Sequence, residues 1–333
     1  MKKTFLFSLL LTLLGTLSAW AEFNPEAGKM YALKEKTSGL YLDIQTLGIH
    51  EPGHTTNSMS LNSKLCIIYF EEGAEGKWRL KNVNDTYGGN ITSVRHWNTT
   101  ISETPYDWII IEEAENGITI AKDESNYIGW DKTNAITSGS ALYNNAEAGN
   151  KDAARIYFTL EEYTGIDITG NASQATIAVS DINGWTKVPA GTAWTISMDV
   201  ENPNGVSYNQ WGSSIFAIGS NAFPEKNGYK GLQFYLQSST NGGELNAVFD
   251  GGDHQIANVT STGNFSAVIS YNGNNQLQIK TTNASSTVAV NDFTLTNKLA
   301  EFSQLAYGLP TGINIKNLLI TKLSNSVDYP TAA

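Results

Sequence analysis

The chain has 333 residues, enough for two domains of ordinary size. Its net charge of −11, from 21 basic and 32 acidic residues, argues against a function that depends on neutralising the phosphates of a nucleic acid. Glycine and aromatic residues are abundant, and long stretches of helical periodicity are lacking, which indicates an all-β protein.

The N-terminus has the pattern of a signal peptide over residues 1–21. Two lysines precede an apolar run at residues 5–17, and Ala19 and Ala21 provide the small residues of a cleavage site. The run is short for a membrane span of about 20 residues, and no cysteine lies near the cleavage point to carry a lipid. We therefore expect a secreted or periplasmic protein without a membrane anchor. The only cysteine is Cys66, so no intramolecular disulfide is possible.

A short cassette, an apolar run that ends in two glutamates, occurs three times before residue 164. The copies lie at residues 68–72, 109–113 and 158–162. Repetition at intervals of 41 and 49 residues predicts one supersecondary unit copied three times. Alternate apolar residues, such as Ile109 and Ile111 in the second copy, are predicted to face a shared core. The glutamates are interpreted as solvated charges at strand ends.

The repeat spacing and phrases such as residues 76–80 (GKWRL) and 141–144 (ALYN) resemble the ricin-like and fascin-like β-trefoils. The resemblance implies a β-trefoil domain over residues 22–163, in a family that is mostly carbohydrate-binding. Ricin-type lectins carry Gln-x-Trp near the closing strand of each repeat, and the glutamine is missing from all three copies here. This departure leaves sugar binding by the trefoil open.

The resemblance also implies one candidate sugar pocket in the third repeat. Trp130 would supply the aromatic face, Asp131 and Asp123 the acidic groups, and Asn144 the amide. The alternative is that Trp130 packs within a loop.

From residue 164 to residue 324 the pattern is of strands and turns. Residues 194–200, 232–236 and 265–271 alternate between apolar and polar side chains, and a turn at 272–275 predicts a hairpin. These features predict a sandwich of two antiparallel sheets, with residues 325–333 as a tail.

Residues 191–198 (GTAWTISM) and 312–321 (GINIKNLLIT) resemble the laminin-G-like branch of the concanavalin A-like jelly rolls. The resemblance implies a jelly-roll domain. Such modules often accompany glycoside hydrolases, sialidases among them, in secreted bacterial proteins.

Candidate catalytic groups are few. Asp199 and Glu201 form one pair of carboxylates at alternate positions, whereas glucanases of the jelly-roll fold use three in register. A charged strand end before the turn at residues 202–205 is the preferred interpretation of the pair. Asp250 and Asp253, on a Gly-rich turn, could hold calcium, although a plain turn is the simpler interpretation.

Sugar binding requires an exposed aromatic face with amides or carboxylates beside it. Trp211 lies in a polar, Gly-bounded segment with Asn209 and Gln210, and Tyr229 lies in a similar segment. Packing at a domain junction is the alternative for both aromatic residues.

Together these patterns predict a non-catalytic, lectin-like protein that recognises extracellular glycans. Two alternatives stay open: a glycoside hydrolase or accessory region of a sialidase-like enzyme, and a protein-interaction or inhibitor module.

Overall fold

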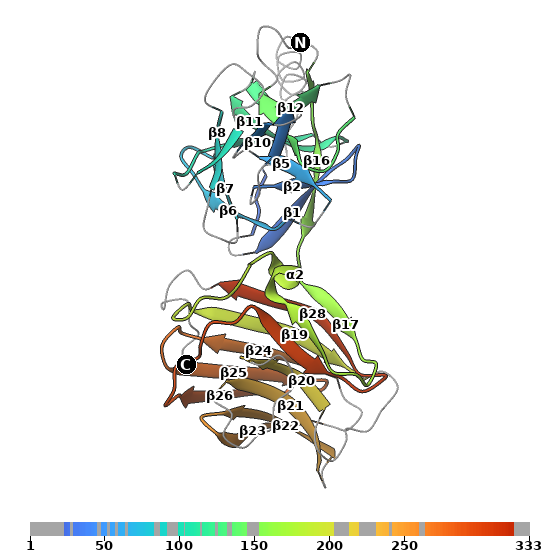
Figure 1. Ribbon diagram of the computed structural model, residues 1–333, viewed down its shortest axis with the longest axis vertical. Helices are drawn as coiled ribbons and strands as arrows, with labels where there is room; N and C mark the ends of the chain where they lie inside the picture. The colour runs from blue at the N-terminus through green and yellow to red at the C-terminus, as the bar shows by residue number, and fades with distance from the viewer. Residues whose placement is uncertain are drawn as a thin grey trace, which may run out of the picture. The chain divides into compact units, whose positions relative to one another are not determined.

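The computed structural model describes residues 23–26, 29–44, 48–51, 54–56, 59–63, 66–82, 87–91, 99–102, 104–113, 115–123, 126–131, 135–144, 153–202, 213–219, 231–239, 242–259 and 264–322. The expected signal peptide, residues 1–21, and the expected tail, residues 325–333, lie outside the described residues. The described chain is almost entirely β-structure, which confirms the all-β class (Figure 1). Among the described helices, none is both long and apolar enough to cross a membrane.

The chain forms two compact units, residues 1–163 and residues 164–333. The strands of the first unit are β1 (Met30–Glu35), β2 (Tyr41–Asp43), β3 (Gly48–Glu51), β4 (His54–Thr56), β5 (Ser60–Asn62), β6 (Ile68–Glu72), β7 (Trp78–Asn82), β8 (Tyr87–Ile91), β9 (Thr99–Ser102), β10 (Ile109–Glu113), β11 (Gly117–Asp123), β12 (Asn126–Asp131), β13 (Ser140–Ala141), β14 (Tyr143–Asn144), β15 (Ala153–Arg155) and β16 (Phe158–Glu162).

Six of these strands close into a ring built from three equivalent antiparallel pairs. The pairs are β16 with β1, β6 with β7, and β10 with β11. Backbone pairings link each pair to the next. These links are Met30 to Tyr69 with Tyr31 to Ile68, Trp78 to Trp108, and Ile118 to Phe158. A closed ring leaves no open sheet edge among these strands.

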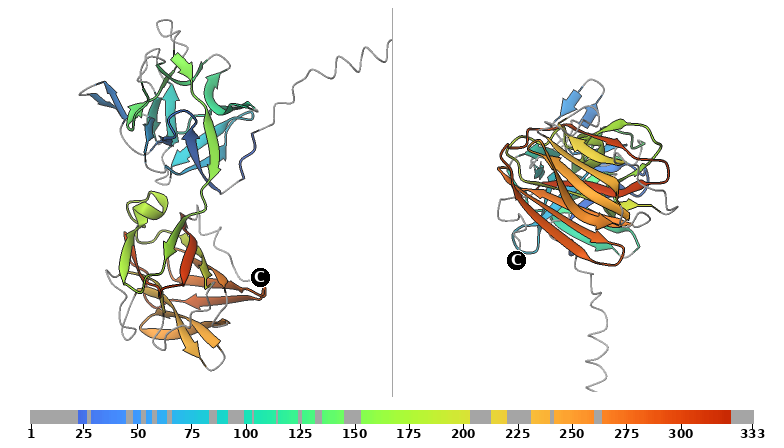
Figure 2. Two further views of the ribbon diagram at one scale, coloured as in Figure 1. Left: turned by 90° about the vertical axis from the view of Figure 1, so that its right-hand side faces the viewer. Right: turned by 90° about the horizontal axis from the view of Figure 1, so that it is seen from below.

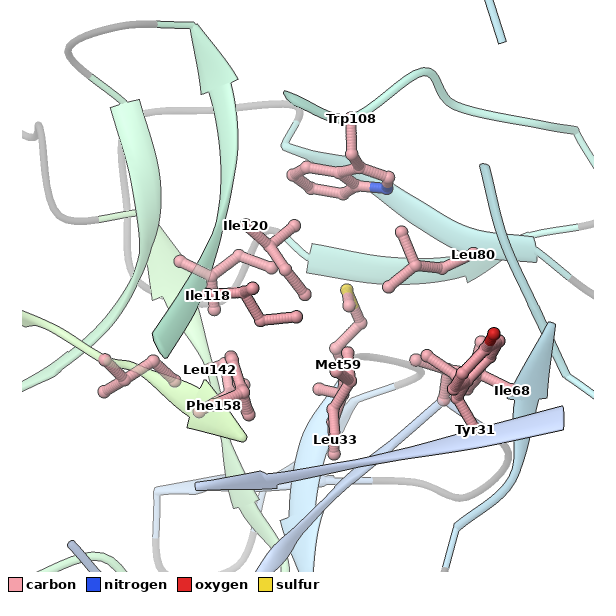
Figure 3. Packing of buried hydrophobic residues seen from close by; sticks show 14 of the residues in the cluster. Tyr31, Leu33, Met59, Ile68, Leu80, Trp108, Ile118, Ile120, Leu142 and Phe158 are labelled. Carbon is pink, nitrogen blue, oxygen red and sulfur yellow. The ribbon is translucent and has the colours of Figure 1, made fainter. Parts of the chain in front are cut away.

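The interior of this ring repeats with the same three-fold pattern. Ile68, Trp108 and Phe158 occupy equivalent positions and are completely buried. Leu33, Leu80 and Ile120 form a second buried set, and the two sets point toward one another in Figure 3. Five of these residues lie on different strands of the ring and Trp108 comes directly before β10, so the core depends on all three pairs being present.

The predicted phase of the second cassette is wrong by one residue. Trp108 is fully buried and Ile110 packs against the core, whereas Ile109 and Ile111 were expected to face it. The register confirms this assignment, because Ile110 pairs with the core residue Ile120. Since side chains alternate between faces, burial of Trp108 forces Ile110 inward and Ile111 outward.

The second unit contains one short helix, α2 (Val179–Asn183), among the described residues. Its strands are β17 (Ile166–Thr169), β18 (Ala175–Ala178), β19 (Trp194–Glu201), β20 (Ser213–Ile218), β21 (Leu232–Ser239), β22 (Gly242–Phe249), β23 (Gly252–Val259), β24 (Phe265–Tyr271), β25 (Gln276–Asn283), β26 (Val288–Thr294), β27 (Gln304–Gly308) and β28 (Asn314–Lys322). The predicted hairpin is present as β24 and β25, where the Asn272 side chain accepts the backbone N–H of Asn274, Asn275 and Gln276.

These strands form two six-stranded antiparallel sheets. The β19 sheet has the order β17-β28-β19-β24-β25-β26, and the β21 sheet has the order β18-β27-β20-β21-β22-β23. The strands of the β21 sheet lie side by side when the molecule is viewed from below (Figure 2).

The two sheets pack face to face through the apolar side of each strand. On β19 the residues alternate between buried and partly exposed, starting with the fully enclosed Trp194. Across the interface, the Phe249 ring of β22 meets the Phe293 ring of β26 edge to face, with centroids 4.9 Å apart. Side chains on the same strand face as Phe249 therefore point inward, and the alternate ones form the outer face of the β21 sheet.

Candidate functional site

The outer face of the β21 sheet carries hydrogen-bonding side chains in three rows across β21, β22 and β23. The backbone register places Gln233, Val248 and Asp253 in one row, Tyr235, Asn246 and Gln255 in the next, and Gln237, Glu244 and Asn258 in the third. We call these nine positions the polar face. All of them except Val248 offer amide, phenol or carboxylate groups.

Burial changes across the polar face from one strand to the next. On β21, Gln233 and Tyr235 are only 1% and 2% exposed, although they point away from the packed interior of the sandwich. On β23, Asp253 and Gln255 are exposed. The polar face therefore has a covered side at β21 and an accessible side at β23.

Tyr235 lies in the middle row and connects these two sides. Its hydroxyl group donates a hydrogen bond to Asp253 Oδ1 over 3.1 Å. Burial raises the pKa of Tyr235 above its ordinary value, and the charge and hydrogen bond of Asp253 raise it further. The phenol thus stays protonated at neutral pH and acts as a donor.

The structure places the two predicted calcium ligands in different networks. Asp250 accepts the backbone N–H groups of Thr296 and Asn297, at 2.6 and 2.9 Å. Its carboxylate therefore reaches toward the chain that follows β26, while the Asp253 carboxylate lies on the polar face. Among the described residues, no group of three or more His, Cys, Asp or Glu side chains is placed to hold a metal ion.

His254, next to Asp253 in sequence, points into the sandwich instead. Its ring stacks on Phe249 with centroids 3.9 Å apart and planes 1° from parallel. The His254 ring also contacts the Phe293 ring, with centroids 5.5 Å apart. His254 therefore contributes to packing at the edge where β23 meets β26.

The predicted aromatic sugar-binding segments cannot be placed. Trp211, Gln210, Asn209 and Tyr229 lie outside the described residues. They belong to the connections on either side of β20, and their role in binding stays a prediction.

The candidate pocket of the first unit is only partly brought together. Trp130 is half-buried and packs against the core of the ring, on the same strand face as Ile128. Asp123 accepts two contacts from the Asn126 amide, at 2.6 and 2.7 Å. Asp131 and Asn144 lie on β12 and β14, which pair with each other, and only their backbone is described.

The glutamates of the cassette take part in two matched networks on the outside of the ring. Glu71 accepts hydrogen bonds from Lys81 and Tyr87, both at 3.0 Å. Glu161 is placed in the same way, since it accepts from Tyr41 at 3.1 Å and pairs with Lys34 at 3.7 Å. These contacts tie neighbouring strands together, while the Glu71 and Glu161 side chains stay 39% and 40% exposed.

The third pair of the ring replaces this network with another. Here Ile111 stands where the other two pairs have a glutamate, and Ala121 stands where they have a lysine. Ala121 pairs with Tyr127 in the sheet, as Lys34 pairs with Tyr41 and Lys81 with Tyr87. The Arg155 guanidinium covers the Tyr127 ring, 3.9 Å from its centroid, and pairs with Glu113 at 2.7 Å. The Arg155 guanidinium is therefore engaged by Tyr127 and Glu113.

The candidate catalytic pair, Asp199 and Glu201, lies on the outer face of the β19 sheet. Both oxygens of Asp199 accept hydrogen bonds, one from the Ser266 hydroxyl at 2.6 Å and one from the Asn317 amide at 2.9 Å. These contacts connect β19 to its two neighbours, β24 and β28. They give Asp199 a structural role in the sheet.

Most of the polar face is not among the predicted site residues. The alternation at residues 232–236 predicts a strand, and it also places Gln233 and Tyr235 on the side opposite Phe234. The available signal was that the polar positions carry amides and a phenol instead of the charged groups typical of a solvated face. Only the register of β22 and β23 brings Asn246 and Asp253 beside them.

No protein-family model matches this chain, and no curated protein sequence matches it. Among solved structures, the chain is similar to a mutant GH54 a-l-arabinofuranosidase at 10% identity and a TM-score of 0.32, over 92% of this chain and 56% of that one. It thus spans about half the length of that enzyme.

Two further solved structures show likeness at the same level. The PL-14 alginate lyase from Aplysia kurodai is 10% identical with a TM-score of 0.30, over 65% of this chain and 87% of that one. The binding domain of botulinum neurotoxin DC, in complex with rat synaptotagmin II, is 13% identical with a TM-score of 0.29, over 51% and 47%. TM-scores this low establish neither a shared fold nor a shared activity.

Proposed function

We propose that this protein binds extracellular glycans without cleaving them, and that the polar face of the β21 sheet contacts the sugar. The observation that carries the proposal is the arrangement of amide, phenol and carboxylate groups in three registered rows. Sugar hydroxyls both donate and accept hydrogen bonds, so they need a surface that offers both kinds of partner at short intervals.

The finer fold assignments belong to the same proposal. The closed ring of three equivalent strand pairs supports a β-trefoil for residues 22–163. Two face-to-face antiparallel sheets support a concanavalin A-like jelly roll, of the laminin-G-like branch, for residues 164–324. The predicted signal peptide would deliver both domains to the periplasm or the cell exterior.

The spacing of carboxylates on the polar face favours binding over hydrolysis. Glu244 pairs across from Asn258, and Asp253 pairs across from Val248, four residues further along β22. Four residues of a strand span roughly 14 Å. Retaining glycosidases place their two carboxyl groups at about 5–5.5 Å, and a backbone separation of this size does not fit that spacing.

A glycan array probed with the full chain tests the proposal, together with an assay for released reducing sugar on every glycan that binds. Binding without cleavage supports a lectin-like function. If a bound glycan is hydrolysed and Asp199→Asn or Glu201→Gln abolishes the hydrolysis, the protein is an enzyme and the proposal is wrong. If the folded protein binds no saccharide but captures a protein that has been deglycosylated, it is an interaction module.

A further inference from the structure

The polar face carries negative charge and, within its strands, no positive charge. Glu244 and Asp253 contribute two carboxylates to it. The strands β20, β21, β22 and β23 contain neither lysine nor arginine. His254, their one remaining basic side chain, stacks on Phe249 on the opposite side of the sheet.

Of the cations described elsewhere in the second unit, Lys187, Lys316 and Lys280 are engaged or distant from this face. Lys298 is exposed in the turn after β26, next to Asn297, which bonds Asp250 at the end of β22. Lys187 pairs with Glu301 at 2.9 Å, and Lys316 pairs with Asp167 at 2.7 Å. Lys280 lies on β25 and points to the outer side of the other sheet.

Arginine, which binds carboxylate and sulfate groups with two parallel hydrogen bonds, is missing altogether from residues 164–333. The last arginine along the chain is Arg155, in the first unit. An anionic sugar on the polar face would therefore meet carboxylates, with no arginine guanidinium from the second unit to offset their charge. One like-charge contact at a partly solvated site weakens binding by on the order of tenfold.

An uncharged sugar fits the same groups well. A carboxylate accepts hydrogen bonds from two neighbouring hydroxyl groups of one ring, and bonds to an ionised acceptor are the stronger kind. Asn246 and Gln255, in the middle row between the two carboxylates, can both donate and accept.

We infer that the polar face binds an uncharged glycan with neighbouring free hydroxyl groups, and that it discriminates against glycans bearing uronate, sialate or sulfate. The inference names the ligand class of the proposed glycan site and rests on that proposal. It makes Glu244 and Asp253 determinants of specificity, in addition to their role as acceptors.

Pairs of polysaccharides that differ in charge alone test the inference with the full chain. One pair is polygalacturonate and its carboxyl-reduced form, and a second is a neutral dextran and its sulfated derivative. We expect the neutral member of at least one pair to bind at least tenfold more tightly than its anionic partner. The preference should shrink as salt rises, because salt screens the repulsion.

The double variant Glu244→Gln with Asp253→Asn separates charge from shape. It should reduce the preference for the neutral member at least tenfold and keep the fold, as circular dichroism would show. Asp181→Asn, which removes an exposed carboxylate on α2, is the matched control and should leave the preference unchanged.

The remaining outcomes separate this inference from the proposed function. Tighter binding of the anionic member would overturn the inference and leave glycan binding intact, and its loss in Lys226→Ala or Lys230→Ala would assign it to the β20–β21 connection. A neutral preference that the double variant does not change would also overturn the inference. Binding of no saccharide by the folded chain would remove the proposed function itself.

Discussion

The two sheets of the second unit present outer faces of different character. On the β19 sheet, Val288 and Val290 are 52% and 47% exposed, and Lys280 beside them is exposed as well. On the β21 sheet, Asn246 is 6% exposed and Val248 is fully buried, although both point away from the sandwich interior. One outer face is largely an open surface, and the other is enclosed along β21 and β22.

Buried polar groups also occur on the β19 sheet, where they pair with side chains on neighbouring strands. The Gln278 amide donates to Asp292 at 2.8 Å, and the hydroxyls of Thr195 and Ser270 lie 3.2 Å apart. These cross-strand pairs join neighbouring strands and stabilise the sheet. The inner faces hold the fold together, and because side chains alternate between faces, each outer face can take a separate role.

A matched valine substitution on both outer faces should give the largest difference in stability. Val248→Ala removes buried methyl groups and should lower the free energy of unfolding by roughly 2 kcal/mol. Val290→Ala, on the open face, should change it by no more than about 0.5 kcal/mol. Urea denaturation measures both values. Equal effects would mean that the two outer faces do not differ in enclosure.

Matched tyrosine substitutions separate the polar face from the interior. Tyr235→Phe removes the hydrogen bond to Asp253 and should cost about 1 kcal/mol of stability, with a clear loss of glycan affinity. Tyr271→Phe removes bonds to Asn274 and Leu299 and should cost a similar amount without changing glycan affinity. Loss of affinity in both variants would point to an indirect effect through stability.

The smallest expected effect concerns acid stability at the turn between β22 and β23. Partial burial alone would raise the pKa of Asp250, but hydrogen bonds from Thr296 and Asn297 outweigh it and lower the pKa below its ordinary value of 3.8. Because the folded-state pKa is depressed, the stabilisation is present above pH 3.8 and is lost as the pH falls through the folded-state value.

Denaturation of wild type and Asp250→Asn between pH 2 and pH 7 checks this assignment. The difference in unfolding free energy between the two proteins should shrink toward the acidic end. A constant difference over the whole range would show that the Asp250 charge does not stabilise the turn.

Composition and repeats sufficed to predict the β class and the three-fold repetition of the first unit. They did not fix the phase of the second cassette, because Ile109, Ile110 and Ile111 are equally apolar and the local pattern gives either phase. Trp108 decides it, since its pairing with Trp78 closes the ring. That contact joins two repeats and cannot be inferred from one of them.

The polar face was beyond sequence analysis for a similar reason. Tyr235, Asn246 and Asp253 are separated along the chain and meet only through the register of three strands. Short-range patterns place Asp253 in a Gly-rich turn, where a plain turn is a simpler interpretation than a calcium site. In the structure the Asp253 carboxylate instead accepts a hydrogen bond from the Tyr235 hydroxyl.

Titration calorimetry with a neutral glycan tests whether the glycan site lies on the polar face of the β21 sheet. The full chain is used in three forms. Wild type and Lys280→Ala, a variant on the open face of the β19 sheet, should bind with the same affinity. Gln255→Ala, in the middle row on the accessible side of the polar face, should bind at least tenfold more weakly while remaining folded. Unchanged binding by folded Gln255→Ala would contradict the assignment of the glycan site to the β21 sheet.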